Sequence, residues 1–519
     1  MTHLLIHLVI VACVAVCFNP ATCIISFVVS QQVPDAEFEA LRALYDSTGG
    51  DSWNWLPEST AGPRWNFTED NSGNTDNPCS SGSGGAAVAN QSWQGVTCSS
   101  TPNWCLTHIC HVTGLTLALY NARGHIPPQI CNLTSLQHLI LENNELQGPL
   151  PSNIGQLTNL TILSLWGNDL TGTIHSTVKK LTGLTYFNLD SNQLTGRIPS
   201  EVGHLTALNE LWFSDNELTG AVPTEIGYLT SLENLYLNLN LLTGTLPTEL
   251  GKLTALRRLS LRNNFLSGTI PRELGNLQLL EVLSLYINQL TGSLPVELVT
   301  YTALQELWLY SNVLTGSLPS DIGALTALEQ LWLYNNELTG SLPSGVGKLT
   351  ALKIMSLYNN RFTGAFPDTI GQMTNLEDIW LRDNEMTGTI PSTICQLTAL
   401  KEIMVQRNRL TGPIPVGIGV LVYLEQLILE GNHLSGEVPS DMAKLSRLRN
   451  LLLNDNRLSG DTKEVFNHSS QLSLTTIDMS NNKLTSVFTS EIFLLPQIKV
   501  LALSGAYIQY PPLFYDIHI

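Results

Sequence analysis

Leucines recur along this chain in a pattern with a strict period of 24 residues. Each period holds two leucines spaced by two, then an asparagine, a glycine and usually a proline, as in Leu139, Leu141, Asn144, Gly148 and Pro151. Apolar residues at alternate positions predict a short strand with one buried face, and stacked repeats place such strands side by side. The pattern therefore predicts a repeat array built on one parallel sheet.

An asparagine stands at the same place in almost every period. It lies four residues before each glycine, and only before the first glycine, Gly124, does Tyr120 take its place. A buried asparagine amide both donates and accepts, so it can satisfy backbone groups of neighbouring repeats. We predict a continuous ladder of Asn144, Asn168, Asn192, Asn216, Asn240, Asn264, Asn288, Asn312, Asn336, Asn360, Asn384, Asn408, Asn432, Asn456 and Asn482.

Glycine and proline mark the turn that follows each ladder asparagine. Proline comes three residues after the glycine in 13 of the 15 repeats, and His175 and Lys463 replace it in the other two. Glycine permits a backbone that a Cβ would hinder, while proline fixes φ and stops a helix from starting too early. Each turn should therefore lead into a short helical segment only after the proline.

The sequence LTGAVPTEIGYLTSL at Leu218–Leu232 resembles the LTGxIPxxIGxLTxL repeat of plant-type extracellular leucine-rich repeat proteins. The resemblance extends from about Asp35 to the C-terminus. It implies an α/β solenoid: a right-handed superhelix with one parallel β-sheet on the concave face and short 3-10 or helical turns on the convex face. Many relatives are receptor-like proteins or receptor-kinase ectodomains, and this chain resembles only their repeat part.

The N-terminal region is similar to the cap of the same family in the segments Ala40–Trp55 and Trp93–Cys98. Such a cap covers the apolar end of the first repeat. Four cysteines cluster there, as an oxidising compartment would favour, and no Cys-x-x-Cys spacing supports a zinc site. We expect disulfides between Cys79 and Cys98 and between Cys105 and Cys110.

Two further cysteines, Cys131 and Cys395, occupy equivalent places in repeats eleven steps apart. Strands lie about 4.8 Å apart, so these thiols are separated by roughly 50 Å, far beyond the reach of a disulfide. We expect both to be buried as apolar residues.

The first 30 residues contain no charged side chain and are largely apolar. They are typical of a secretory signal cleaved before Gln31, and an uncleaved anchor broken at Asn19 and Pro20 is the alternative. No later run is apolar for long enough to span a membrane.

The expected domains are residues 1–30 as signal peptide or anchor, 31–111 as a cap with a long flexible loop, 112–510 as about 17 repeats, and 511–519 as a C-terminal tail. Sequons fit a secreted glycoprotein at Asn66, Asn90, Asn132, Asn159 and Asn467.

The net charge of −18 argues against nucleic acid as a partner, because no basic stripe is present to neutralise phosphates. The nucleotide-binding, metalloprotease and serine-hydrolase motifs G-x-x-x-x-G-K-[ST], H-E-x-x-H and G-x-S-x-G are absent from the sequence. We therefore expect no enzymatic activity, no catalytic residues, no metal site and no cofactor.

Large aromatic residues recur at positions that should face away from the core. Counted back from each ladder asparagine, the third and fifth residues are buried, so the second, fourth and sixth face the concave surface. Tryptophan and tyrosine recur at the second and fourth positions over about six strands, and arginines mark both ends of the tyrosine run. The expected ligand-binding residues are Trp212, Tyr236, Arg262, Tyr286, Trp308, Tyr310, Trp332, Tyr334, Tyr358, Trp380 and Arg382.

These aromatic columns have two interpretations. Aromatic residues are good strand formers, so stacked neighbours could simply stabilise the sheet. Eight large rings on adjacent strands instead favour an interaction site, with Glu306, Gln330, Asp378 and Glu402 as its polar border.

We expect a secreted or cell-surface recognition module, in signalling or defence, that binds an extracellular protein, peptide or glycan. A membrane co-receptor is a further expected partner. The alternative function is an inhibitor of a polysaccharide-degrading enzyme or a structural protein of the cell wall or matrix.

Overall fold

The computed structural model describes residues 33–57, 61, 63–67, 77–79, 92–99, 109–485 and 490–503. These residues form two compact units, one ending at Asn192 and the other beginning at Gln193. The expected signal or anchor, Asn90, Cys105 and the C-terminal tail lie outside the described residues. Within that described part of the chain, no helix has the length and apolar character needed to cross a membrane.

The first unit begins with a cap. Helix α1 (Asp35–Ser47) is followed by the short helix η1 (Gly50–Ser52) and by β1 (Val96–Cys98), which pairs antiparallel with β2 (Val112–Thr116). The buried carboxylate of Glu37 anchors α1, because it accepts a hydrogen bond of 2.8 Å from the backbone N–H of Val112. The cap core is aromatic, with ring centroids of Trp53 and Trp65 5.1 Å apart.

The cap cysteines that the structure describes are disulfide-bonded. A disulfide joins Cys79 to Cys98, as expected from the sequence, with the Cα atoms 5.8 Å apart. Cys110 is also disulfide-bonded, while its expected partner lies outside the described residues. Of the two cysteines outside the cap, Cys131 is a buried free thiol, but Cys395 is only partly buried. The expectation that both are buried as apolar residues was therefore wrong for Cys395.

Three repeats complete the first unit. Parallel strands run in the order β2, β4 (His138–Ile140), β6 (Ile162–Ser164) and β8 (Tyr186–Asn188). A second series of parallel strands, β3 (Arg123–His125), β5 (Glu145–Pro149) and β7 (Asp169–Gly172), follows the ladder positions. The 3-10 helices of these repeats are η2 (Pro128–Asn132), η3 (Ile154–Gln156) and η4 (Ser176–Lys180).

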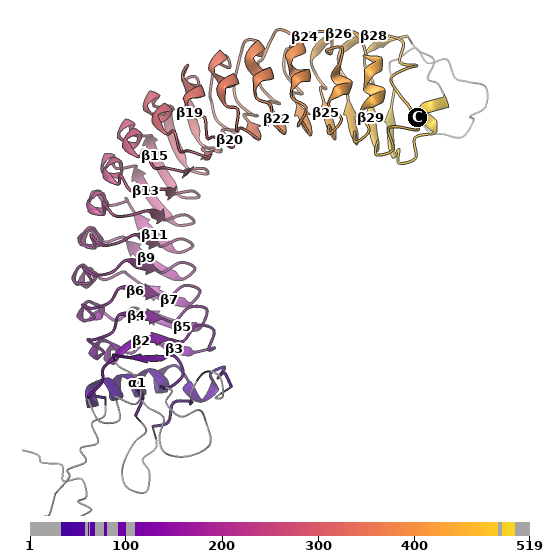
Figure 1. The fold of residues 1–519 in the computed structure, drawn as a ribbon. Coiled ribbons are helices and arrows are strands. Elements are labelled where there is room, and N and C mark those ends of the chain that lie inside the picture. The colour runs from indigo at the N-terminus through magenta and orange to yellow at the C-terminus, as the bar shows by residue number, and fades with distance from the viewer. Residues whose placement is uncertain are drawn as a thin grey trace, which may run out of the picture. The chain divides into compact units, whose positions relative to one another are not determined.

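The second unit contains the longest run of repeats. Its main parallel sheet is formed by β10 (Glu210–Trp212), β12 (Asn234–Tyr236), β14 (Arg258–Ser260), β16 (Val282–Ser284), β18 (Glu306–Trp308), β20 (Gln330–Trp332), β21 (Ile354–Ser356), β22 (Asp378–Trp380), β23 (Glu402–Met404), β25 (Gln426–Ile428), β27 (Asn450–Leu452), β29 (Thr476–Asp478) and β31 (Val500–Ala502). Within this unit the sheet lies on the inside of the curve, and we call that side the concave face (Figure 1).

The outer side of the second unit carries short 3-10 helices (Figure 1). They are η5 (Ser200–His204), η6 (Thr224–Tyr228), η7 (Thr248–Lys252), η8 (Arg272–Asn276), η9 (Val296–Thr300), η10 (Ile322–Ala324), η11 (Ser344–Lys348), η12 (Asp368–Gln372), η13 (Ser392–Gln396), η14 (Ile418–Val420) and η15 (Ser440–Lys444). A short α-helix, α4 (Ser490–Phe493), lies near the end. Proline caps most of these helices, as with Pro343 before η11, where φ is −69°.

A second series of strands, absent from the sequence prediction, follows the ladder asparagines here as well. It comprises β9 (Gln193–Arg197), β11 (Glu217–Gly220), β13 (Leu241–Thr245), β15 (Phe265–Thr269), β17 (Gln289–Ser293) and β19 (Val313–Thr315), then β24 (Thr411–Gly412), β26 (His433–Glu437), β28 (Arg457–Gly460) and β30 (Lys483–Leu484). Glycine is required at its repeated position in this second series, because Gly316 has φ +75° and an added Cβ would lie 2.9 Å from the Cβ of Ser293.

The asparagine ladder connects successive repeats through their backbones. The Nδ2 atom of Asn336 donates to the carbonyls of Leu309 and Leu333 at 3.1 and 3.0 Å. Its Oδ1 accepts from the N–H of Leu314 at 3.0 Å. Each amide therefore ties its own repeat to the one before it, and the same three bonds recur along the ladder. Buried backbone groups that no strand pairs are satisfied in this way.

The residue before each ladder asparagine has a left-handed backbone. Asn335 at this place has φ 54°, and most equivalent residues are asparagine, aspartate, serine or glycine. Ile287 has the same conformation, with φ 53°, although a β-branched side chain rarely adopts it. This position therefore carries local backbone strain.

We expect Asn336→Ala to lower the free energy of unfolding by about 3 kcal/mol, because three buried backbone groups lose their partner. Asn375→Ala is the matched control, since Asn375 is exposed and makes one bond of 2.8 Å to the carbonyl of Thr350. Urea unfolding of both variants measures the difference. Equal losses would show that the ladder bonds contribute no more than a surface contact.

We expect Ile287→Asn to raise the free energy of unfolding by about 1 kcal/mol, because asparagine tolerates the left-handed conformation. The control is Val313→Asn, an exposed strand position whose backbone is not left-handed. If both variants change stability equally in urea unfolding, relief of backbone strain is not the cause.

Candidate functional site

The aromatic residues predicted from the sequence gather on the concave face of the second unit. Strands β18, β20 and β22 each present a buried central residue between two partly exposed ones, so Trp308, Trp332 and Trp380 point away from the core. We define the aromatic surface as the rings of Tyr286, Trp308, Tyr310, Trp332, Tyr334, Tyr358 and Trp380. Each ring is half-buried by its neighbours and partly open to solvent.

Four tyrosines of this surface form one stack. Ring centroids are 4.1 Å apart between Tyr286 and Tyr310, 4.3 Å between Tyr310 and Tyr334, and 4.3 Å between Tyr334 and Tyr358. The interplanar angles are 14°, 11° and 9°, so the rings are nearly parallel. Strand spacing explains the distance, because neighbouring strands place equivalent side chains one ladder step apart.

The tryptophans lie beside the stack in the adjacent column. Trp308 and Trp332 have centroids 6.5 Å apart, and Trp332 meets Trp380 edge to face at 6.1 Å. Trp332 also contacts Tyr310 at 6.0 Å, which joins the two columns. Tilted and edge-to-face contacts of this kind are favourable for aromatic quadrupoles. Seven rings therefore form one connected surface.

Trp212 on β10 and Tyr236 on β12 lie on the same face, four and three repeats before Trp308. Their strands pair in register, and their ring centroids are 4.2 Å apart. Ser260 and Ser284 occupy the equivalent positions on the two strands that follow. This pair thus forms a second aromatic contact on the concave face. The two serine strands separate it from the strand of Trp308.

Four polar atoms beneath the aromatic surface lack hydrogen-bond partners among the described residues. They are Nε1 of Trp308 and Trp332 and the hydroxyls of Ser284 and Ser356. All four residues lie in one register row across β16, β18, β20 and β21. By contrast, Trp212 and Trp380 each donate to a glutamate at 2.9 Å. The serines were not predicted, although a small residue within an aromatic column could have indicated them.

The polar border predicted from the sequence lies beside the tryptophans. Burial, followed by the carboxylates of Glu402 and Glu377, raises the pKa of Asp378 to about 6. Burial also raises the pKa of Glu306. Glu402 is held in place, because it accepts from Trp380 at 2.9 Å and from Gln426 at 2.7 Å. This margin of the surface is therefore acidic and partly desolvated.

The next column outward carries ion pairs between successive repeats. Lys353 pairs with Glu329 at 2.6 Å, Arg449 pairs with Glu425 at 3.3 Å, and Lys401 pairs with Glu377. Charges alternate in sign along this column, so each cation lies opposite a carboxylate one strand away. Among the described residues, no three His, Cys, Asp or Glu side chains are grouped as a metal site.

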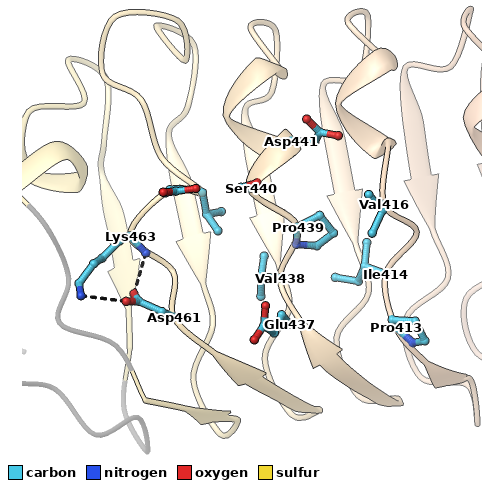
Figure 2. A pocket seen from close by; sticks show the side chains of 12 residues that line it. Pro413, Ile414, Val416, Glu437, Val438, Pro439, Ser440, Asp441, Asp461 and Lys463 are labelled. Carbon is cyan, nitrogen blue, oxygen red and sulfur yellow. Dashed lines mark hydrogen bonds and ion pairs between the residues drawn. The ribbon is translucent and has the colours of Figure 1, made fainter.

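A separate cavity of about 500 Å³ lies near the end of the second unit (Figure 2). The segments that follow β24, β26 and β28 line it, and Lys463 takes the place of the usual repeat proline there. Lys463 Nζ lies 2.9 Å from Asp461 Oδ2, and this lysine lowers the pKa of Asp461. Asp441 is paired with Lys444. Because these ionic groups are already paired, the aromatic surface is the stronger candidate site.

The remaining sequence-predicted surface features are exposed where the structure describes them. The side chains of Asn66, Asn132, Asn159 and Asn467 lie at exposed positions. Asn159 donates to the carbonyl of Thr134 at 2.9 Å. Exposure makes these sequons accessible, and their glycosylation stays a prediction.

The raised pKa of Asp378 makes stability depend on pH. Because the folded chain binds this proton more tightly than the unfolded chain, ionisation of Asp378 destabilises the fold as pH rises from about 4 through 6. Between pH 4 and pH 7.5, the free energy of unfolding of wild type should fall by on the order of 1 kcal/mol relative to that of Asp378→Asn. This figure includes a reduction for the partial exposure of Asp378. Urea unfolding at both pH values measures this, with the exposed Asp321→Asn as control. A difference that stays constant with pH would contradict it.

Comparison with solved structures gives relatives of the same architecture. The plant peptide hormone receptor RGFR1 in complex with RGF2 is 31% identical over 75% of this chain and 66% of that one, with a TM-score of 0.71. A TDR receptor is 34% identical over 76% and 68% of the two chains, with a TM-score of 0.72. The Leptospira interrogans protein LIC12759 is 32% identical over 74% and 94%, with a TM-score of 0.59. A search of curated proteins found no match.

Family models agree with these structural relatives. The leucine-rich repeat region model matches residues 164–307, 247–341 and 300–411. The single leucine-rich repeat model matches residues 135–157, 423–445 and 473–495. With the parallel sheet, the 3-10 turns and the asparagine ladder in place, this chain belongs to the plant-type leucine-rich repeat family.

Proposed function

We propose that this protein is an extracellular recognition module that binds its ligand at the aromatic surface. The observation that carries the proposal is the connected set of seven rings on adjacent strands of the concave face. Contiguous exposed aromatic surface is uncommon on soluble proteins and is enriched at interaction sites. Tyrosine and tryptophan combine large contact area with a polar atom, which suits binding hot spots.

The relatives favour a peptide as the ligand. RGFR1 is described as a plant peptide hormone receptor in complex with RGF2, and TDR is described as a receptor. Both resemble this chain over about three quarters of its length. A flat sheet face suits an extended chain, because a peptide can lie across several strands and contact one side chain from each.

The polar atoms below the rings support the same proposal. The unpartnered N–H groups of Trp308 and Trp332 carry a free-energy cost of about 1 to 3 kcal/mol each. A peptide that reorients the indole rings on binding would accept from these donors through its carbonyls and offset part of that cost. The buried hydroxyls of Ser284 and Ser356 lie in the same row and also lack partners among the described residues.

A selection experiment tests the proposal. The probes are a phage-displayed library of random twelve-residue peptides and a glycan array, applied to secreted residues 31–519. We expect selected peptides to bind at least tenfold more weakly to Trp308→Ala/Trp332→Ala than to wild type. Tyr228→Ala is the control, because Tyr228 is an exposed aromatic residue on helix η6 of the outer side.

Urea unfolding and circular dichroism establish that each variant is folded. Peptides that bind wild type and the double variant equally would place the site elsewhere. Selection of glycans instead of peptides would favour a polysaccharide-directed role. Unfolding of the double variant would show that the rings stabilise the sheet, and single variants at Trp308 and Trp332 would then be compared with Tyr228→Ala.

A further inference from the structure

The tyrosine stack is closed at both ends by arginine. The guanidinium carbon of Arg262 lies 5.3 Å from the ring centroid of Tyr286, and that of Arg382 lies 4.3 Å from the ring centroid of Tyr358. Cation–π contacts of this kind hold a guanidinium group over an aromatic face. The column therefore consists of four stacked rings between two positive charges.

Stacking decides which parts of the tyrosines a ligand can reach. Each inner ring face lies against another ring, and each outer face lies against an arginine, so no face of this column is free for a sugar ring. The ring edges and hydroxyls remain. Burial raises the pKa of Tyr310 and, more than any other cause, raises that of Tyr334 to about 12. The column thus presents a row of neutral hydroxyl groups.

The two arginines lack close acidic partners. Among the described residues, Arg262 forms no ion pair, and the carboxylate contact of Arg382 is a distant one of 3.9 Å to Asp383. Asp383 itself is held by Arg407, whose Nη2 lies 3.0 Å from its Oδ2. Arg257 and Arg258, one strand from Tyr286, both pair with Glu281. A cation–π contact leaves the charge of a guanidinium group in place, so both ends of the stack attract anions.

The contacts along the stack limit the distance between these charges. Five successive steps of 5.3, 4.1, 4.3, 4.3 and 4.3 Å place the two guanidinium carbons no more than about 22 Å apart. An extended peptide advances about 3.4 Å per residue, and alternate side chains share a face. Side chains six residues apart therefore lie on the same face about 20 Å apart, whereas those five or seven apart lie on opposite faces.

The acidic border restricts charge between the two ends. Glu306 stands on β18, between the strands that lead to the two arginines, and its carboxylate is already partly desolvated. A ligand with negative charges along its whole length, such as an oligouronate, would meet repulsion there. A ligand that is neutral in the middle and acidic at two points avoids it. Charge complementarity therefore favours acidic groups at the two ends of the ligand and disfavours them at its middle.

We propose that the aromatic surface recognises an extended peptide carrying two acidic side chains six residues apart. One carboxylate binds Arg262 and the other binds Arg382, while the neutral residues between them lie along the tyrosine hydroxyls. This inference rests on the proposed function and adds the chemical class, direction of extension and charge spacing of the ligand. Bidentate guanidinium–carboxylate pairing provides the geometric selectivity.

A series of synthetic peptides tests the spacing. Fluorescein-labelled peptides of alanine, serine and glycine carry two aspartates at offsets of four, five, six, seven or eight residues, with a di-asparagine peptide as the neutral probe. Fluorescence anisotropy with secreted residues 31–519 at low salt gives their affinities. We expect the offset of six to bind about tenfold more tightly than the neutral peptide, and the offsets of five and seven to bind more weakly.

Matched variants test the two arginines. Arg262→Gln and Arg382→Gln should each remove the preference for six residues, and the corresponding lysine variants should restore part of it by keeping the charge. Arg447→Gln is the control, because Arg447 also lies over a tyrosine, 4.6 Å from the ring centroid of Tyr423, but outside the aromatic surface. Near-ultraviolet circular dichroism checks that the tyrosine stack is intact in each variant.

Several results would overturn this assignment. The spacing is rejected if the affinities do not depend on the offset, if the neutral peptide binds equally well, or if no peptide binds measurably. It is also rejected if Arg262→Gln behaves like Arg447→Gln. Tighter binding of an oligouronate would replace the peptide with an acidic glycan. If library-selected peptides still require Trp308 and Trp332 in any of these cases, the proposed function stands and the charge assignment alone is wrong.

Discussion

The hydrogen bonds of the buried asparagine ladder are the constraint on which the rest of the structure depends. A short strand of three residues pairs only part of the backbone in each repeat, and the turn after it leaves carbonyl and N–H groups inside. The amide of Asn336 satisfies two carbonyls and one N–H at once, and its counterparts do the same in their repeats. Without these amides the turns would bury polar groups at a high free-energy cost.

The ladder also determines where functional side chains lie. Since each amide joins its repeat to the one before it, successive strands pair without any shift in register, as Glu306, Leu307 and Trp308 pair with Gln330, Leu331 and Trp332. A residue type repeated every 24 positions then becomes a straight column on the sheet. The tyrosine stack and the alternating ion pairs of Lys353 and Glu329 are both products of this register.

Stability and recognition are combined in the aromatic surface. Tyrosines 4.1 to 4.3 Å apart stabilise the sheet as cross-strand pairs, and the same stacking covers their faces and leaves their hydroxyls available. The surface also retains features that stability alone does not favour. The indole N–H groups of Trp308 and Trp332 have no hydrogen-bond partner within the described part of the chain, and Asp378 is partly desolvated beside other carboxylates. Locally unfavourable features of this kind are common at functional sites.

The sequence by itself determined the period, the ladder, the buried leucine positions of each strand and the columns of aromatic residues. It could do so because all of these follow from local alternation and from a repeat of constant length. It did not reveal the second series of strands, the partial exposure of Cys395 or the buried hydroxyls of Ser284 and Ser356 beside the tryptophans. Only the tertiary structure decided that the tyrosines stack face to face, that Arg262 and Arg382 cover the ends of the stack, and which polar atoms lack partners. These features depend on side-chain rotamers and on contacts between residues 24 positions apart, and a linear pattern specifies neither.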